Sequence, residues 1–170
     1  MTRLFKRTGR VVLAIFGLLL IGGAVAFAQE VSTNRPLVKL SLTGAVERER
    51  QMISVYKAGP VKPGEVVNFT MSSVNEGAAA ARDYRAIGQI PAGATFVAGS
   101  ALTNNHIQVS YSIDGGEKFS STPLIDEKQA DGSIKKVAAP VSMYTQVRFE
   151  WANPIAAGSK VVASYQVRVK

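Results

Sequence analysis

Apolar and polar residues alternate with a period of two along most of the chain beyond residue 36, the pattern of β-strands that bury one face. The last stretch is the most regular, because valine, alanine or tyrosine occupies every second position from Val161 to Val169. We therefore expect strands at Val38–Thr43 (ended by Gly44), Met52–Tyr56, Val66–Val74, Arg85–Ile90, Thr95–Val97, Ile107–Ile113, Lys118–Ser120, Val147–Trp151 and Val161–Val169.

Proline and glycine separate these segments at positions that predict tight turns. Proline presets φ at the first corner of a turn, and glycine accepts the positive φ of the second. A run of Asp, Gly and Gly between two alternating stretches predicts a hairpin. The residues expected to form these structural turns are Pro63, Gly64, Pro91, Gly93, Asp114, Gly115 and Gly116.

Two segments lack a clear alternation. The run Ala78–Ala81 has good helix propensity, so a short helix over Glu76–Tyr84 is the alternative to a loop followed by a strand. We favour the loop, because alanines offer too little apolar surface to hold an isolated helical turn. The polar segment Asp126–Pro140 is expected to be an exposed and mobile loop.

Short strands at regular spacing, with Pro/Gly turns between them, predict an all-β protein with one antiparallel β-sandwich of the immunoglobulin-like type. We expect this domain to cover residues 37–170. A domain of this length can bury roughly two thirds of the surface that its unfolded chain exposes.

The first residues have a different composition, which predicts a secretory signal peptide over residues 1–28. A basic start (Arg3, Lys6, Arg7 and Arg10) precedes Val11–Ala28, which carries no charge. Cleavage is expected after Ala28, because Ala26 and Ala28 supply the small residues that a signal peptidase accepts before Gln29. An uncleaved membrane anchor is the alternative, since the apolar run reaches the lower length limit of a membrane span. Residues 29–36 would then form a polar leader.

Several short motifs recur in a specific order and spacing between Leu37 and Lys170. They are Val61–Thr70, Asn75–Gly77, Ile90–Ser100, Tyr111–Gly116 with Phe119, Tyr144–Phe149 and Pro154–Gly158. Together these motifs resemble the DUF11 repeat domain of bacterial surface and secreted proteins. The resemblance implies an immunoglobulin-like sandwich at the bacterial cell envelope or outside the cell, and it implies no known catalytic activity.

Charge and residue counts exclude several other classes of function. Nucleic-acid binding is not expected, because the basic residues beyond residue 28 are scattered and form no cluster tighter than Lys135 and Lys136. The chain contains no cysteine, so disulfides, thiolate metal sites and a cysteine nucleophile are excluded. His106 is the only histidine, which excludes sites that need two imidazoles.

The remaining polar candidates suggest no enzyme and no cofactor. A serine hydrolase would have to use His106 as its base, and no nucleophile elbow accompanies it. A glycosidase needs two facing carboxylates, and no spacing pairs the acidic candidates. Calcium could be held by Asp126, Glu127 and Asp131, although nearby lysines favour a solvated loop. The acidic candidates are Glu65, Asp83, Asp114, Glu117 and Glu150.

The sequence therefore predicts an exported, non-catalytic module that contacts another envelope or extracellular protein. A carbohydrate- or matrix-binding domain is the alternative, in which Tyr144 and Trp151 would form an exposed platform for a glycan. Trp151 shares its predicted strand face with Val147 and Phe149, so a place in the core is favoured. A membrane contact is expected only through residues 1–28, if they are not removed.

Overall fold

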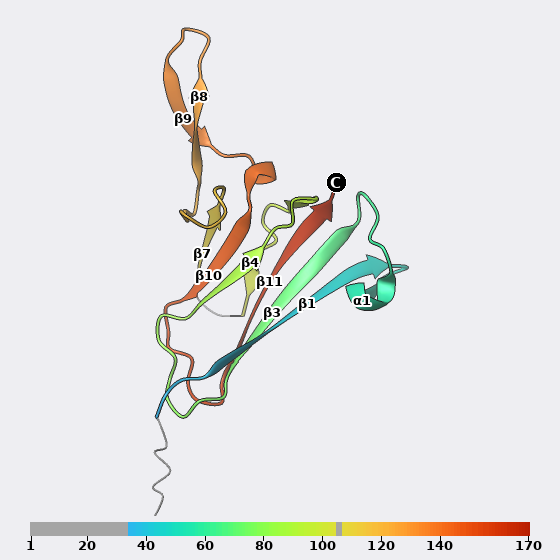
Figure 1. Ribbon diagram of the computed structural model, residues 1–170, viewed down its shortest axis with the longest axis vertical. Coiled ribbons are helices and arrows are strands. Elements are labelled where there is room, and N and C mark those ends of the chain that lie inside the picture. Colours follow the sequence, from blue (N-terminus) through green and yellow to red (C-terminus); the bar gives the residue numbers. More distant parts are fainter. Residues whose placement is uncertain (1–33, 105–106) are drawn as a thin grey trace, which may run out of the picture. The chain divides into compact units, whose positions relative to one another are not determined.

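The computed structural model describes residues 34–104 and 107–170, and these residues form an all-β fold (Figure 1). The predicted signal segment 1–28, its cleavage site at Ala26, Ala28 and Gln29, and His106 lie outside the described residues. The strands are β1 (Val38–Arg48), β2 (Gln51–Ser54), β3 (Val66–Asn75), β4 (Arg85–Gln89), β5 (Ala94–Phe96), β6 (Leu102–Thr103), β7 (Ile107–Ser112), β8 (Leu124–Lys128), β9 (Ile134–Ala138), β10 (Gln146–Trp151) and β11 (Lys160–Val169). The helices are α1 (Val55–Ala58) and a 3₁₀ turn, η1 (Val141–Met143).

Two antiparallel sheets of unequal width pack against each other. The wider sheet has the order β2-β1-β3-β11-β5, with β6 also paired to β11. The narrower sheet has the order β4-β10-β7. The prediction of an antiparallel sandwich-like fold is confirmed. The difference in width leaves part of the wider sheet uncovered, because three strands cannot cover every strand of it.

The core lies between the two sheets and is built from the alternating strands. Alternate residues of β11, from Val161 to Val167, are buried, and Val147, Phe149 and Trp151 of β10 face them. Trp151 is only 5% exposed, so its predicted place in the core is confirmed. Burial of these large side chains supplies most of the favourable free energy of folding.

The predicted strand Lys118–Ser120 is absent except for an isolated bridge of Ser120 with Tyr111, and two other strands have clearly different boundaries. β1 does not end at Gly44 but continues to Arg48. A Cβ at Gly44 would lie 3.2 Å from both the ring of Phe69 and a methyl of Val55, so this glycine makes room for packing and does not form a turn. The predicted strand Met52–Tyr56 is shorter, because the chain turns into α1 at Val55.

The segment Asp126–Pro140 is mostly exposed as predicted, but it is not a loop, because it forms most of a β-hairpin. β8 and β9 pair with each other and with neither sheet, and Figure 1 draws them as a separate ribbon in orange. Asp126 lies opposite Lys136 and Glu127 lies opposite Lys135, so opposite charges face each other across the strands. The alternative helix over Glu76–Tyr84 is also absent, and a loop occupies that stretch as favoured.

Candidate functional site

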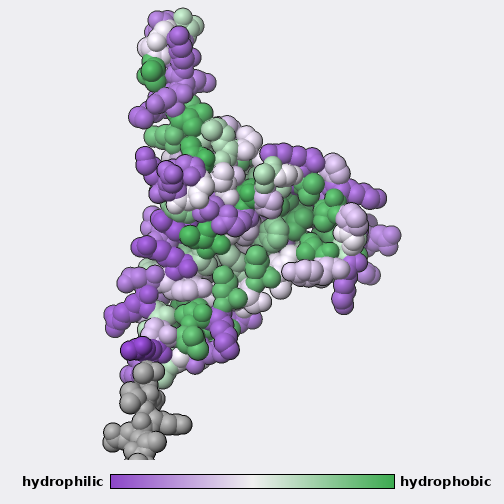
Figure 2. Space-filling view, in the orientation of Figure 1, coloured by the Kyte–Doolittle hydropathy of each residue, from purple (hydrophilic) through white to green (hydrophobic). Residues whose placement is uncertain are grey.

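The inner face of β1 is only partly covered. Leu42 lies opposite Met71 and Leu40 lies opposite Ser73 in the register of β1 with β3. Directly opposed residues of an antiparallel pair point to the same face, and Met71 and Ser73 are both buried. Leu40 and Leu42 therefore belong to the inner face, yet they are 49% and 51% exposed. Figure 2 shows apolar side chains gathered along the diagonal path that β1 follows in Figure 1.

The reach of the narrower sheet explains this exposure. Its strand β4 approaches β11 so closely that a Cβ at Gly88 would lie 2.3 Å from the ring of Tyr165. The Tyr165 hydroxyl also donates a hydrogen bond of 2.8 Å to the carbonyl of Gln89. β4 is the edge strand of the narrower sheet, so this sheet does not extend over β1. Near Gly44, the side chains of Phe69 and Val55 pack over β1 instead.

One edge of β1 is also open. β2 pairs with β1 only from Ala45 to Arg48, and within the described residues no strand pairs with that edge over Val38–Gly44. Glu76 N–H donates to the carbonyl of Leu37, which turns the backbone groups of Leu37 toward β3. Because these groups alternate along an antiparallel strand, those of Val38, Leu40 and Leu42 point to the open edge, whereas those of Gly44 face Val55 at the start of α1. We call Val38–Thr43, with its outward backbone groups and its two half-exposed leucines, the β1 edge.

Asn75 fixes the entry of the chain into the β1 edge. Its side chain is fully buried, and its Oδ1 accepts hydrogen bonds of 3.1 Å from the N–H groups of Leu37 and Gly77. Its Nδ2 donates to the carbonyls of Ala79 (2.7 Å) and Ile155 (2.8 Å). The sequence singled out Asn75 and Gly77 only as a motif. Gly77 is needed because a Cβ there would lie 2.3 Å from the backbone that enters β1.

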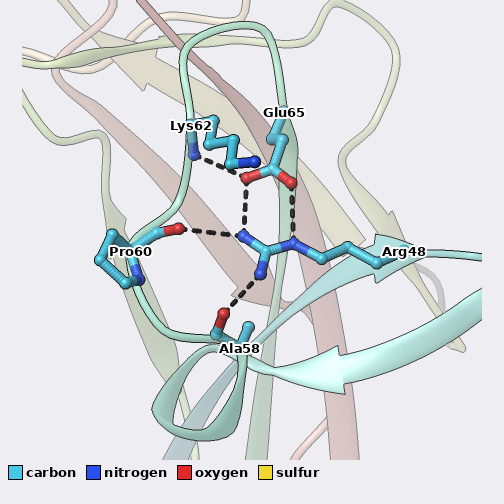
Figure 3. A network of polar contacts seen from close by, with 5 residues as sticks. All are labelled: Arg48, Ala58, Pro60, Lys62 and Glu65. Carbon is cyan, nitrogen blue, oxygen red and sulfur yellow. Dashed lines mark hydrogen bonds and ion pairs between the residues drawn. The ribbon is translucent and has the colours of Figure 1, made fainter.

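A polar network fixes the other end of β1 (Figure 3). Arg48 forms a bidentate ion pair with Glu65, at 2.8 Å from Nε to Oε1 and 2.9 Å from Nη2 to Oε2. The same guanidinium donates to the carbonyls of Ala58 and Pro60. The network ties the loop after α1 to β1, and sequence reasoning missed it because these residues are far apart in the chain.

The hydrogen bonds from the Arg48 guanidinium hold the pKa of Glu65 at about 2, below its usual value of 4.5. The backbone N–H of Lys62 adds a hydrogen bond of 2.6 Å to the same carboxylate. The sequence offers Glu65 as a candidate catalytic acid, but this pairing stabilises its charged form. A carboxylate that stays ionised serves as an anchor for Arg48.

The predicted turn at Asp114–Gly116 is stabilised by its own side chains. The Asp114 carboxylate accepts hydrogen bonds from the backbone N–H of Lys118 (3.0 Å) and from the Ser112 hydroxyl (2.7 Å), which lower its pKa in that order of importance. Gly115 and Gly116 have φ values of 78° and 103°. The turn leads the chain to Ser120, which exchanges backbone hydrogen bonds with Tyr111.

Backbone hydrogen bonds stabilise the other two predicted turns. Gly64 follows Pro63 with a φ of 85°, and its N–H donates to the carbonyl of Val169 at 2.9 Å. In the turn that contains Pro91 and Gly93, the N–H of Ala94 donates to the carbonyl of Pro91 at 2.8 Å. These residues close turns at the ends of strands, and none of them contributes a polar side chain to a site.

Of the acidic candidates, only Asp83 and Glu150 line a common pocket, which they share with Arg85. Glu150 pairs with Arg85 and Arg148, at 2.6 and 2.9 Å. In the hairpin, Asp126 pairs with Lys136, and Asp131 accepts hydrogen bonds from Ser133. Over residues 34–104 and 107–170, no group of three acidic or histidine side chains could hold a metal ion.

The two aromatic candidates for a glycan platform lie apart from each other in the packing. Trp151 packs against Tyr84 and Phe149 in the core. Tyr144 stacks on Tyr111 with their ring centroids 4.7 Å apart, and both contact Phe96. The contact of Phe96 on β5 with Tyr111 on β7 therefore joins the two sheets.

In comparisons with known proteins, no family model, no curated protein and no solved structure matches the chain. Within the part of the chain that the structure describes, no helix is long and apolar enough to cross a membrane. The β1 edge is the feature of this part of the chain with the clearest capacity to bind a partner.

Proposed function

We propose that the protein is an exported, non-catalytic immunoglobulin-like module that binds another protein at the bacterial cell envelope or outside the cell. The single observation that carries this proposal is the β1 edge, where Leu40 and Leu42 are half exposed beside backbone donors and acceptors that no strand of residues 34–104 and 107–170 pairs with. An added strand would satisfy these backbone groups and bury the leucines, which is how many proteins recognise extended segments.

The sequence supports the compartment and the type of domain. The basic and apolar composition of residues 1–28 favours export, and the resemblance to the DUF11 repeat domain favours a role at the bacterial surface. N-terminal mass spectrometry of the protein recovered from the cell tests the export step, with a chain that begins at Gln29 as the expected result. An intact chain in the membrane fraction would favour the anchored alternative.

Capture from an envelope extract tests the binding role. Leu42→Lys places a charge on the β1 edge, whereas the matched control Leu102→Lys changes a leucine of β6 that is 62% exposed. We expect wild type and Leu102→Lys to retain the same partner and Leu42→Lys to lose it. Equal retention by all three proteins would contradict a role for the β1 edge. Glycan binding that is lost in Trp151→Ala or Tyr144→Ala would instead support the carbohydrate-binding alternative.

A further inference from the structure

We infer that the β8–β9 hairpin is a cleavage site for an endopeptidase that recognises basic residues, and that the cut chain remains one folded unit. This site is separate from the β1 edge and goes beyond the proposed binding function. An endopeptidase binds its substrate as an extended segment, so it cuts a folded protein only where the chain opens locally. The hairpin opens without the two sheets, carries exposed lysines, and lies where a cut leaves both sheets joined.

The hairpin is anchored to the rest of the molecule at its base. Pro123 and Ala139 are buried there, and the N–H of Ala139 donates to the carbonyl of Pro123 at 2.8 Å. Beyond this base, β8 and β9 contain no buried residue and pair only with each other. Figure 2 shows many hydrophilic side chains along this segment. Opening of the hairpin therefore breaks no hydrogen bond of the two sheets and exposes little additional apolar surface.

The contacts within the hairpin are too weak to keep it closed at all times. A two-stranded hairpin by itself is marginally stable in water. The ion pair of Lys136 with Asp126 measures 3.1 Å, but its side chains are 71% and 60% exposed, and exposed ion pairs add little stability. At the tip, the N–H of Gln129 donates to the carbonyl of Ser133 at 2.8 Å. Proteolysis follows the population of the open form, which is largest where local opening is easiest.

The hairpin presents the side chains that such an endopeptidase recognises. Lys128, Lys135 and Lys136 are all exposed. A carboxylate in the specificity pocket of a serine endopeptidase selects lysine or arginine before the bond that is cut. Lys128 is the last residue of β8 and lies next to the tip, opposite Ile134, so opening of the tip frees the bond between Lys128 and Gln129 first.

The reaction at this bond is a simple hydrolysis. The C–N bond between Lys128 and Gln129 breaks, the hydroxyl of one water molecule joins the carbonyl carbon of Lys128, and the remaining hydrogen joins the nitrogen of Gln129. Water is the only co-reactant, and the endopeptidase supplies the catalytic groups.

A cut in the hairpin leaves the two fragments joined through both sheets. The C-terminal fragment carries β10 and β11. β10 lies between β4 and β7 of the narrower sheet, and β11 lies between β3 and β5 of the wider sheet. The buried side chains of Phe149 and Tyr165 belong to this fragment, and the ring of Tyr165 stacks on Phe69 of the other fragment. The fragments therefore share the hydrophobic core as well as the hydrogen bonds of both sheets.

Limited digestion of the full chain with trypsin, followed by mass spectrometry, tests the cleavage site. Within residues 34–104 and 107–170, we expect the first cut after Lys128 and later cuts after Lys135 or Lys136. The triple variant Lys128→Gln, Lys135→Gln, Lys136→Gln should lose these products, and its cleavage in this part of the chain should slow by about tenfold or more, because a charged specificity pocket rejects an uncharged side chain. Circular dichroism should show that the variant keeps its fold.

Lys57→Gln is the matched control for exposure alone. Lys57 is exposed, but Arg48 holds the carbonyls of Ala58 and Pro60, so the chain that follows Lys57 is fixed. We expect this variant to be cut like wild type. A first cut after Lys57 or another basic residue of the two sheets and their turns, or equal rates for wild type and the triple variant, would overturn the proposed site.

Gel filtration of the digest without denaturant tests whether the cut chain stays together. We expect the two fragments to elute as one species at the position of the intact protein and to separate only on a denaturing gel. Fragments that elute separately would overturn the inference that the cut chain remains one folded unit.

Discussion

The side chain of Asn75 joins three parts of the chain that are separate in sequence: the entry to β1, the loop after β3 and the backbone of Ile155. Asn75→Ala removes every one of these hydrogen bonds and leaves buried backbone groups unpaired. We expect it to lower the free energy of unfolding by about 3 kcal/mol, because an unsatisfied buried donor or acceptor costs roughly 1–3 kcal/mol. Chemical denaturation measures this loss. The exposed Asn153→Ala should change little, and an equal loss in both variants would contradict the assigned role.

The ion pair between Arg48 and Glu65 makes stability depend on pH. The folded state holds the pKa of Glu65 at about 2, below the usual 4.5, so the folded state stabilises the ionised carboxylate. This contribution is fully present above the unfolded pKa and is lost as the pH falls from about 4.5 toward 2. Urea midpoints measured across this range should fall less steeply for Glu65→Gln than for wild type. Glu47→Gln, on the exposed face of β1, should follow the wild-type curve. Identical slopes in all three proteins would refute the pairing.

Gly116 adopts a φ of 103°, which side chains with a Cβ disfavour. A Cβ there would also lie 2.5 Å from the Gln146 amide oxygen. Gly116→Val should therefore lower the free energy of unfolding by about 1–2 kcal/mol. Thermal denaturation would detect this change. Gly93→Val is the control, because nothing lies within 4 Å of a Cβ at Gly93. Partner binding that disappears in Gly116→Val without a change in melting would make the turn part of the site.

At the level of elements, the alternation of apolar and polar residues predicted the strands that bury one whole face, such as β3, β10 and β11. It did not predict strands whose extent depends on contacts with residues elsewhere in the chain. Gly44 continues β1 because Phe69 and Val55 pack over it, a contact that no local pattern indicates. β8 and β9 lack an apolar face, and their opposed charges become visible only in register.

The β8–β9 hairpin pairs with neither sheet, so we expect the two sheets to fold without it. Replacement of residues 125–137 by a short Gly-Ser turn should leave the melting temperature within a few degrees of wild type, since few core contacts are lost. Near-ultraviolet circular dichroism reports the packing of Trp151 and the tyrosines. Loss of that signal in the shortened protein would show that the hairpin supports the core.

For the whole molecule, the sequence predicted the class of the fold but not the candidate site. Leu40 and Leu42 belong to an alternation that is identical to that of a fully covered strand. Their exposure depends on the different widths of the two sheets and on the end of β2 pairing at Ala45. Both are properties of the assembled sandwich. The turn residues were visible in the sequence because their role is local.

The central claim is that the β1 edge is open in the single chain and closes when a partner strand binds. Residue-resolved amide hydrogen exchange by NMR in dilute solution tests the open edge most directly. The amides of Leu40 and Leu42 should exchange fast, while that of Ser41, which points to β3, should be protected. Protection of both leucines in the dilute single chain would contradict the account.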